Sequence, residues 1–391
     1  MKQIFPVFLL LILAIGCNEE ERPMNTRNEI NPIVKELQTK YAPDKRTAIF
    51  SVAVTEKKGS VTLKGEVDDP AAKDELMARF GAQSGKVIDS VDVLPSQDLG
   101  EKTWGIITVS VANMRSDPKE SAELGSQVLM GSIVKVWKKK SGFAYVQSPD
   151  HYLGWVDTDQ LHRVTKKEAK AWDGAQKIFV KGLLDVVHEQ PDENSYPVCD
   201  LVGGDVLKRI AAKGPWIAVE LADGRKGYVK QSIVIDAAEW GKSLRPVPEN
   251  IERTGKFLMG VPYLWGGTSV KGVDCSGFTK TVFLLNGVML NRDANQQADQ
   301  GVPVEPGTKF ANLKKGDLLF FGKKAGGGRP ERIVHVGIYL GNQVYIHSSG
   351  KVQVSSFDPA SPIFNEYNLD RFVRARRVIP DAPKVKEVAV Q

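Results

Sequence analysis

A single cysteine lies in the stretch Tyr263-Leu-Trp-Gly-Gly-Thr-Ser-Val-Lys-Gly-Val-Asp-Cys-Ser-Gly-Phe-Thr-Lys280. This residue, Cys275, follows a glycine-rich loop and precedes an apolar run, Phe278 to Leu285, whose spacing predicts a buried helix. Asp274 is placed to cap that helix, and Ser276 falls in its first turn. Free backbone N–H groups and the positive end of the helix dipole favour a thiolate at this position. We therefore interpret Cys275 as a nucleophile, the alternative being a small buried hydrophobic residue.

Length and composition limit the class of protein. The chain has 391 residues, of which 42% are hydrophobic and 26% are charged, as expected for two to four domains. Its net charge of +6 is small for this length, so we expect no nucleic-acid partner. The three cysteines, Cys17, Cys199 and Cys275, have neither CxxC spacing nor a neighbouring cluster of metal ligands. We therefore expect no structural metal and no disulfide framework.

The first residues have the pattern of an export signal. An apolar run from Ile4 to Gly16 is too short to span a bilayer but suits a signal peptide. It ends in Leu13-Ala-Ile-Gly-Cys17, which resembles a bacterial lipobox with alanine in place of the more usual leucine. The resemblance implies a signal peptide over residues 1–16, a lipid on Cys17 and a tether over residues 17–30. We expect a lipid-anchored protein of the cell envelope, on its periplasmic or surface face; an ordinary signal peptide or an uncleaved anchor is the alternative.

Residues 31–98 predict a small α/β domain. After a short opening helix, alternating apolar residues indicate strands near 50–54 and 61–67, followed by a helix over 69–80 and a strand over 87–94. This order of elements, with the phrase Val61-Thr-Leu-Lys-Gly-Glu-Val67, resembles the BON domain of bacterial envelope proteins. A spacer is the simplest role for such a domain.

Two similar segments follow, residues 102–164 and 176–237, joined by a charged helical connector. Each contains short alternating strands separated by glycine-rich turns, a pattern typical of a small barrel. They share closing phrases, Gly154-Trp-Val156 and Gly227-Tyr-Val229. This internal repeat resembles the bacterial SH3 domain found in many cell-wall enzymes.

Two histidines lie downstream of the cysteine, on segments with the pattern of strands. His335 lies in Ile333-Val-His-Val-Gly-Ile-Tyr-Leu340 and His347 ends Gln343-Val-Tyr-Ile-His347, with Gly341-Asn342 as a hairpin signal between them. A two-residue loop at Gly341-Asn342 would place the histidines on opposite faces of the sheet, whereas a three-residue loop would place them on one face. We predict an odd-length loop or a compensating bulge, because only then can the two rings meet.

The histidines give the cysteine a base and a group that orients the base. On this interpretation His335 deprotonates Cys275 and later protonates the leaving amine, while His347 fixes the orientation of His335. The backbone N–H of Cys275 and the hydroxyl of Tyr263 would hold the oxyanion. Each histidine alone is better explained as a sheet histidine with satisfied hydrogen bonds. The combination with the glycine-flanked cysteine favours catalysis.

Five motifs near the C-terminus stand in a fixed order. They are Pro262-Tyr263-x-Trp265-Gly-Gly, Asp274-Cys275-Ser276-Gly-Phe, Arg292-Asp293-x-x-x-Gln297, Gly316-Asp317-Leu-Leu-Phe-Phe321 and His335-Val-Gly-Ile-Tyr339. Their order and spacing resemble the NlpC-type cell-wall peptidases, which are papain-like cysteine peptidases. The resemblance implies a catalytic domain over residues 249–378, with Tyr263, Trp265, Ser276 and Arg292 beside the substrate. It also implies cleavage of peptidoglycan stem peptides, usually between γ-D-glutamyl and a diamino acid.

The two SH3-like segments make the chain similar to the γ-D-glutamyl-L-diamino acid endopeptidases of murein peptide recycling. In those enzymes an acid and a tyrosine of the first SH3 domain, with the aspartate before the nucleophile, capture a free N-terminal L-alanine. The matching residues here are Glu123, Tyr152 and Asp274. Each assignment has an alternative. Glu123 would then be a solvated acid in a loop, Tyr145 would take the role of Tyr152, and Asp274 would serve only as a helix cap.

The chain departs from the family at one position in the catalytic domain. The residue after Arg292-Asp293 is often Ser or Thr, which can bond the substrate, whereas here it is Ala294. The sequence therefore does not assign the residue that binds the glutamyl carboxylate. Ser276, Arg292 and backbone N–H groups are the candidates.

These observations predict an α+β protein: a lipoprotein signal, a small BON-like α/β domain, two SH3-like β-barrels, a papain-like α+β catalytic domain and a tail over 379–391. We expect a monomeric cysteine endopeptidase, bound to the membrane by its lipid, that cuts γ-D-glutamyl–diamino acid bonds of murein peptides with a free N-terminal L-Ala. We expect no metal and no organic cofactor. A murein hydrolase of intact wall, a non-catalytic wall-binding scaffold, and an amidase or acyltransferase are the alternatives.

Overall fold

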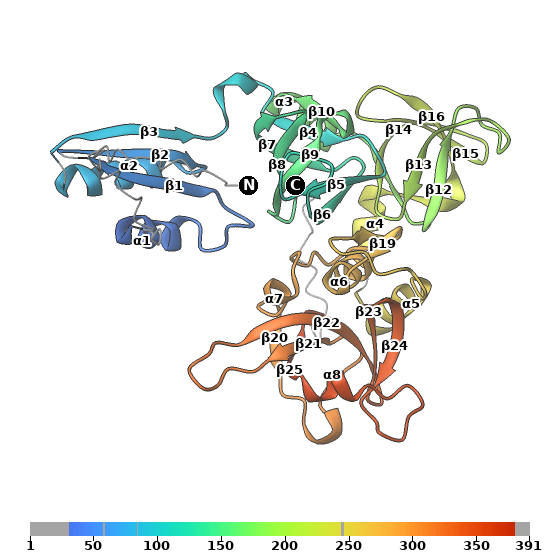
Figure 1. Cartoon of the computed structure of the whole chain (residues 1–391). Helices are drawn as coiled ribbons and strands as arrows, with labels where there is room; N and C mark the ends of the chain where they lie inside the picture. Colours follow the sequence, from blue (N-terminus) through green and yellow to red (C-terminus); the bar gives the residue numbers. More distant parts are fainter. Residues whose placement is uncertain (1–30, 58, 84, 244–245, 380–391) are drawn as a thin grey trace, which may run out of the picture.

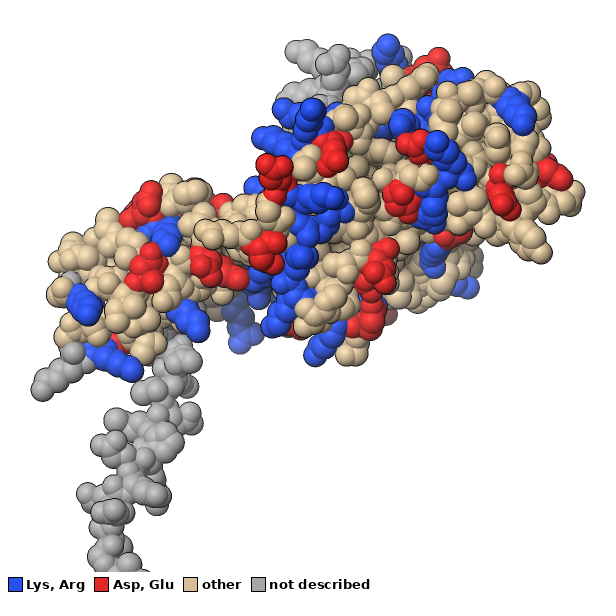
Figure 2. Space-filling view, turned by 90° about the horizontal axis from the view of Figure 1, so that it is seen from above, with Lys and Arg blue, Asp and Glu red and all other residues tan. Residues whose placement is uncertain are grey.

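The computed structural model describes residues 31–379, except 58, 84, 244 and 245. The predicted signal peptide, the tether with Cys17, and the tail beyond residue 379 lie outside the described residues. Figure 1 shows the N-terminal α/β domain to one side, the two barrels next to each other, and the C-terminal domain beneath them. Seen from above, basic and acidic side chains are interspersed over the surface, and the N-terminal domain forms a lobe at one end (Figure 2). Among the described residues, no helix has the length and apolarity needed to cross a bilayer.

The N-terminal domain has the predicted order of strand, strand, helix and strand. Its elements are α1 (Pro32–Tyr41), β1 (Phe50–Lys57), β2 (Ser60–Val67), α2 (Pro70–Gln83) and β3 (Val87–Val93). β1 and β2 form an antiparallel hairpin, and β3 pairs with β2 in parallel, which requires the crossover that α2 supplies. Leu37, Leu63 and Leu76 are fully buried where the helices meet the sheet.

The internal repeat is two barrels with one topology. The first contains β4 (Trp104–Ile107), β5 (Val111–Arg115), β6 (Leu124–Leu129), β7 (Ile133–Lys140), β8 (Phe143–Gln147), β9 (Leu153–Asp157) and β10 (Leu161–Val164). The second contains β11 (Lys177–Val180), β12 (Leu184–His188), β13 (Pro197–Val202), β14 (Val206–Lys213), β15 (Trp216–Glu220), β16 (Lys226–Lys230) and β17 (Val234–Asp236). The strand orders are β10-β4-β7-β8-β9-β5-β6 and β17-β11-β14-β15-β16-β12-β13, which correspond strand for strand. The connector is α3 (Lys166–Asp173), which begins with a Thr165–Glu168 capping box.

The C-terminal domain packs helices on a six-stranded sheet. Its helices are α5 (Pro248–Phe257), α6 (Cys275–Leu284), α7 (Ala294–Gln297) and α8 (Glu366–Asp370). The preceding helix, α4 (Ala237–Ser243), packs on β11 and β17 of the second barrel. The strands of the C-terminal domain are the small pair β18 (Thr268–Ser269) and β19 (Gly272–Val273), and the sheet of β20 (Val302–Val304), β21 (Leu318–Lys323), β22 (Arg332–Gly341), β23 (Val344–Ser349), β24 (Lys351–Ser356) and β25 (Phe372–Arg377). The sheet order is β20-β25-β21-β22-β23-β24. Short 3₁₀ turns lie at Gln97–Leu99, Thr158–Gln160, Gln231–Ile233 and Thr308–Phe310.

The alternation of side chains on the sheet fixes the position of the helix that begins with Cys275. On β21, Phe320 belongs to the cluster that contains Phe278 of α6, while Phe321 belongs to a cluster on the other face. Burying a phenylalanine side chain contributes roughly 1.5–3 kcal/mol, so Phe278 and Phe320 hold α6 firmly on the sheet. Figure 1 shows α6 between the sheet and the barrels. The first residue of α6, Cys275, lines a cavity together with residues of the first barrel.

Candidate active site

Cys275 occupies the predicted position, the first residue of a helix capped by Asp274. The Asp274 carboxylate accepts a hydrogen bond from the Gly277 N–H at 2.7 Å, which confirms the predicted N-cap. The Cys275 thiol is 8% exposed and interacts with the backbone of Val336, the residue after His335. Within the described part of the chain, the Cys275 N–H makes no hydrogen bond, so it is available to an oxyanion.

The expectation that the helix terminus favours a thiolate is wrong for the free protein. Burial, followed by the negative charge of Asp274, raises the pKa of the Cys275 thiol to about 11. The helix N-terminus offers partial charges only, and they do not outweigh the loss of water around the sulfur. The thiol is therefore neutral near pH 7, and attack on a substrate requires a base to take its proton.

The histidine hairpin meets the parity condition through a bulge. The turn residues are Asn342 and Gln343, one position later than the sequence signal suggested, and the register shifts between Tyr339 and Gly341. The bulge shifts the pairing by one residue, as a three-residue loop would, so both rings lie on one face of the sheet. His335 Nε2 lies 2.8 Å from His347 Nδ1, and the ring centroids are 5.0 Å apart. The prediction of a bulge or an odd loop is confirmed.

A third residue completes the histidine chain. His347 Nε2 lies 3.1 Å from the hydroxyl of Ser355 on β24. If His347 donates to Ser355, its Nδ1 accepts from His335 Nε2, and the other nitrogen of His335 is left as a base. Burial lowers the pKa of His347 to about 4 and that of His335 well below its usual range. Both rings are therefore neutral at pH 7, which is the state that a base requires.

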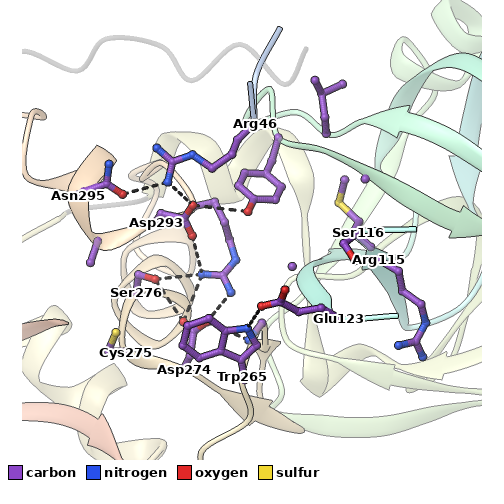
Figure 3. A pocket seen from close by; sticks show the side chains of 18 of the residues that line it. Arg46, Arg115, Ser116, Glu123, Trp265, Asp274, Cys275, Ser276, Asp293 and Asn295 are labelled. Carbon is purple, nitrogen blue, oxygen red and sulfur yellow. Dashed lines mark hydrogen bonds and ion pairs between the residues drawn. The ribbon is translucent and has the colours of Figure 1, made fainter. Parts of the chain in front are cut away.

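The predicted substrate residues meet in one cavity of about 640 Å³ between the C-terminal domain and the first barrel (Figure 3). The C-terminal domain contributes six of the predicted residues, which are Tyr263, Trp265, Asp274, Cys275, Ser276 and Arg292. The first barrel contributes Glu123 and Tyr152. His335 and His347 do not line this cavity; they are 7% and 1% exposed and lie buried in the sheet.

Arg292 and Asp274 form a buried ion pair in the floor of the cavity. Arg292 Nη2 lies 2.5 Å from Asp274 Oδ2, and Nη1 donates to the Ser276 hydroxyl at 3.0 Å. Asp274 also accepts from the Gly266 N–H at 3.0 Å. Arg292 is 2% exposed, so its charge is used within the protein. This pairing places Ser276 and Arg292 beside the cavity but leaves neither as a free partner for a carboxylate.

Glu123 is the carboxylate of the cavity without a cationic partner. Its Oε1 accepts a hydrogen bond from the Trp265 indole N–H at 2.7 Å, and none of the ion pairs among the described residues includes it. Trp265 itself is 62% exposed. Figure 3 shows this bond joining the first barrel to the C-terminal domain across the cavity. The resemblance predicted Glu123 as a residue of this site, and the structure adds the hydrogen bond from Trp265 that orients its carboxylate.

Tyr152 reaches the C-terminal domain, whereas its rival Tyr145 stays within the barrel. The Tyr152 hydroxyl lies 3.5 Å from Asp293 Oδ2. The ring of Tyr145 packs on Trp155 with centroids 4.9 Å apart, although Tyr145 also lines the cavity. A buried ion pair between Lys280 of α6 and Asp150 fixes the turn that carries Tyr152. Sequence alone could not separate the two tyrosines, because the distinction depends on the neighbouring domain.

Sequence reasoning missed the N-terminal domain as part of the cavity. Lys45 and Arg46, from the loop between α1 and β1, line it, and Arg46 bonds Asp293 and Asn295. No local signal marks these residues, since the cavity partners of Arg46 lie about 250 positions away. Among residues 31–379, apart from the gaps, no group of three or more His, Cys, Asp or Glu side chains is arranged to hold a metal ion.

A cysteine on a helix N-terminus, packed on a sheet that carries a buried histidine pair, defines the class of papain-like cysteine hydrolases. Comparisons with known proteins narrow this class. Residues 260–377 match the NlpC/P60 family, and residues 114–161 match the bacterial dipeptidyl-peptidase Sh3 domain. The crystal structure of an NlpC/P60 family protein from Bacillus cereus aligns with a TM-score of 0.61 and 23% identity, covering 71% of this chain and 100% of that one, which supports the fold.

Curated relatives agree with the family match. Dipeptidyl-peptidase 6 of Lysinibacillus sphaericus is 32% identical over 273 residues, covering 67% of this chain and 94% of that protein. Gamma-D-glutamyl-L-lysine dipeptidyl-peptidase of Bacillus subtilis is 32% identical over 206 residues, covering 50% and 66%. Its namesake in Bacillus cereus is 26% identical over 293 residues, covering 73% and 80%. The chain belongs to the NlpC/P60 family of peptidoglycan cysteine peptidases and carries a bacterial SH3 domain.

Proposed function

We propose that this peptidase hydrolyses the bond between γ-D-glutamate and the following diamino acid in stem peptides whose L-alanine has a free amino group. The observation that carries the proposal is Glu123, a carboxylate with no cation beside it, held over the cavity by Trp265. An ammonium is the group that such a carboxylate selects. A stem whose alanine nitrogen is acylated would leave Glu123 desolvated and unpaired, which costs binding free energy.

The other residues at the amino end fit the same task. Tyr152 lines the cavity with Glu123, and its hydroxyl can accept from an ammonium. The negative charge of Asp274 is already neutralised by Arg292, so Asp274 contributes less to amine binding than Glu123 does. Its larger role is to cap α6 and to hold Arg292 in the floor of the cavity.

The proposed reaction uses Cys275 and the histidine pair. His335 takes the thiol proton as sulfur attacks the γ-carbonyl carbon, and the Cys275 N–H with the Tyr263 hydroxyl receives the negative oxygen. Collapse of this intermediate breaks the C–N bond, and His335 gives its proton to the leaving amine. Water then attacks the thioester, with its proton passing to His335, and releases the L-Ala-γ-D-Glu dipeptide and the thiol. His347 and Ser355 keep His335 oriented throughout.

The names of the relatives support this bond. Two of them are called gamma-D-glutamyl-L-lysine dipeptidyl-peptidase, a name that specifies both the γ-D-glutamyl bond and release of a dipeptide. The diamino acid of this chain's substrate is either lysine or meso-diaminopimelate. The first barrel, which provides Glu123 and Tyr152, lies in the region that matches the dipeptidyl-peptidase Sh3 domain.

The deciding experiment compares two substrates on the wild-type protein. L-Ala-γ-D-Glu-meso-diaminopimelate and its N-acetyl derivative are incubated with the protein, and the dipeptide product is followed by mass spectrometry. We expect the free amine to be cleaved with a kcat/KM about 10²-fold above that of the acetylated peptide. Equal turnover of both peptides, or faster digestion of intact wall, would identify the protein as a hydrolase of the sacculus instead.

We also propose a place in the cell for the protein. The lipobox-like sequence ending at Cys17 suits a lipoprotein of the cell envelope, and the order of elements in the N-terminal domain suits a BON-like module. A monomer on the membrane, acting on small murein peptides, is consistent with both. Replacing Cys17 with serine should move the protein from the membrane fraction to the soluble fraction, and an unchanged distribution would rule out the lipid anchor.

A further inference from the structure

The N-terminal domain reaches into the active-site cavity through one loop. Residues 43–47, between α1 and β1, are here called the cationic loop because they carry Lys45 and Arg46, which both line the cavity. Arg46 Nη1 lies 2.6 Å from Asp293 Oδ2 and 3.0 Å from Asn295 Oδ1. Gln296 donates to Asp44 at 2.8 Å. The loop therefore bonds the N-cap residue of α7 and two residues of its first turn.

The position of the cationic loop is fixed by the domain interface. Ile49 and Leu94 of the N-terminal domain are buried against Trp137 and Leu153 of the first barrel. The backbone of the loop also pairs with that barrel, since Leu153 N–H donates to the Arg46 carbonyl at 2.8 Å. These contacts hold the loop beside the cavity without the help of a substrate.

The substrate proposed above carries one carboxylate close to the bond that is cut. The D-glutamyl residue is linked through its side chain, so its α-carboxylate stays free and must lie in the cavity when the γ-carbonyl meets Cys275. Position 294 is an alanine and has no donor for it. Arg292 is buried, and its guanidinium is hydrogen-bonded to Asp274 and Ser276. Arg115 also lines the cavity, but its guanidinium is held by Glu120 and by the Ala122 carbonyl.

The cationic loop offers a cation, Lys45, and a hydrogen-bond donor of Arg46 that the described residues do not use. Arg46 is shared between Asp44 and Asp293, which orients its guanidinium and leaves one Nη2 hydrogen with no partner among the described residues. Lys45 is exposed, lines the cavity, and forms no ion pair with the part of the chain that the structure describes. Figure 3 shows Arg46 on one side of the cavity and Glu123 on another, with Cys275 apart from both. Among the described residues, one side thus holds an unpaired carboxylate, Glu123, and the other an unpaired cation, Lys45, beside the Arg46–Asp293 ion pair.

We propose that the cationic loop completes the substrate pocket, with Lys45 and Arg46 receiving the free α-carboxylate of the γ-linked D-glutamyl residue. The inference rests on the proposed function, because it takes the γ-D-glutamyl bond as the one that is cut. Asp293 and Asn295 are positioning residues, since they hold Arg46 at the cavity. The N-terminal domain is accordingly a part of the binding site and more than a spacer.

The test uses the full-length protein and two peptides that differ in this carboxylate alone. One is L-Ala-γ-D-Glu-meso-diaminopimelate, and the other carries D-isoglutamine, whose α-carboxylate is an uncharged amide. We expect wild type to favour the carboxylate peptide, and Lys45→Met to reduce the ratio of the two kcat/KM values about three- to tenfold, through KM. Arg46→Met should reduce the ratio further, and Arg46→Lys should restore part of it.

The control is Lys40→Met, the same change at a lysine of the same domain that pairs with Glu75 and does not line the cavity. It should leave the ratio unchanged. Lys45 is exposed, so its replacement does not threaten folding. If Lys45→Met and Arg46→Met keep the wild-type ratio, the inference is wrong while the proposed function stands. The same conclusion holds if Arg332→Met alone abolishes the ratio, because Arg332 is another exposed cation that lines the cavity. If wild type cleaves neither peptide, the proposed function itself fails.

Discussion

The two barrels have the same strand order, yet only the first lines the active-site cavity. In the first barrel, the turn before β6 carries Glu123 and the turn before β9 carries Tyr152. The corresponding turns of the second barrel carry Tyr196, which is 82% exposed, and Arg225, which donates to the carbonyl of Thr108 in the first barrel. The same fold thus presents cavity-lining side chains in one copy, and in the other an exposed tyrosine and an arginine at the interface between the barrels.

The second barrel supports the first. Asp205 is fully buried at their junction and accepts from the N–H groups of Met130 and Val202. Lys271 of the C-terminal domain pairs with Asp200 of the second barrel. The first barrel meets the C-terminal domain through Gln127, which bonds Thr268 twice. A repeated domain therefore acquires a function through the parts of the protein that pack against its loops, because its strands specify only the fold.

The largest expected difference in activity is between substitutions of two cysteines, Cys275 in the C-terminal domain and Cys199 in the second barrel. Cys275→Ala should reduce kcat by at least about 10⁴-fold, since it removes the attacking atom. Cys199 lies on β13 of the second barrel, and Cys199→Ala should leave turnover unchanged. Dipeptide release from L-Ala-γ-D-Glu-meso-diaminopimelate measures both. Turnover that survives in Cys275→Ala would exclude this residue as the nucleophile.

Acid should weaken the C-terminal domain through its histidine pair. The pKa of His347 is lowered to about 4 by burial, whereas in the unfolded chain it is near 6.5. The unfolded chain therefore binds more protons between these values, and the stabilisation that is present above pH 6.5 is lost as the pH falls toward 4, by about 3 kcal/mol. Urea unfolding at pH 7.5, 6 and 5 measures this slope. His347→Gln should flatten it, and an equal slope in the variant would assign the effect to other groups.

The same substitution in the two barrels tests whether only the first selects substrate. Glu123→Gln should lower kcat/KM for the free-amine peptide about 10- to 100-fold, because the ammonium loses its charged partner. The N-acetyl peptide should be little affected. Glu193→Gln, in the corresponding loop of the second barrel, should behave as wild type for both peptides. Equal effects of the two changes would end the distinction between the barrels.

The junction of the barrels should matter for stability more than for chemistry. Asp205→Ala leaves the buried N–H groups of Met130 and Val202 without an acceptor, which should cost about 2 kcal/mol of unfolding free energy. The KM for the free-amine peptide should change less than threefold, since Asp205 does not line the cavity. A denaturant titration alongside steady-state kinetics measures both. A large KM change with unaltered stability would mean that the second barrel shapes the pocket directly.

Local patterns predicted much of the fold and part of the candidate site. Alternating apolar residues predicted the strand–strand–helix–strand order of the N-terminal domain and the internal repeat, because pairing and burial impose a period of two. The loop and apolar run around Cys275 predicted a capped helix. Parity predicted that His335 and His347 need an irregular hairpin, although the bulge itself has no signal in the sequence.

The sequence alone placed Cys275 at the start of a capped helix and His335 and His347 on one face of an irregular hairpin, since helix caps, strand alternation and hairpin parity depend on neighbours in the chain. Tertiary structure decided the protonation of Cys275, because desolvation depends on everything packed around the sulfur. It also decided which barrel adjoins the cavity and brought Arg46 to Asp293, across 247 positions of sequence. Contacts of that range follow from how the domains pack, which no local pattern records.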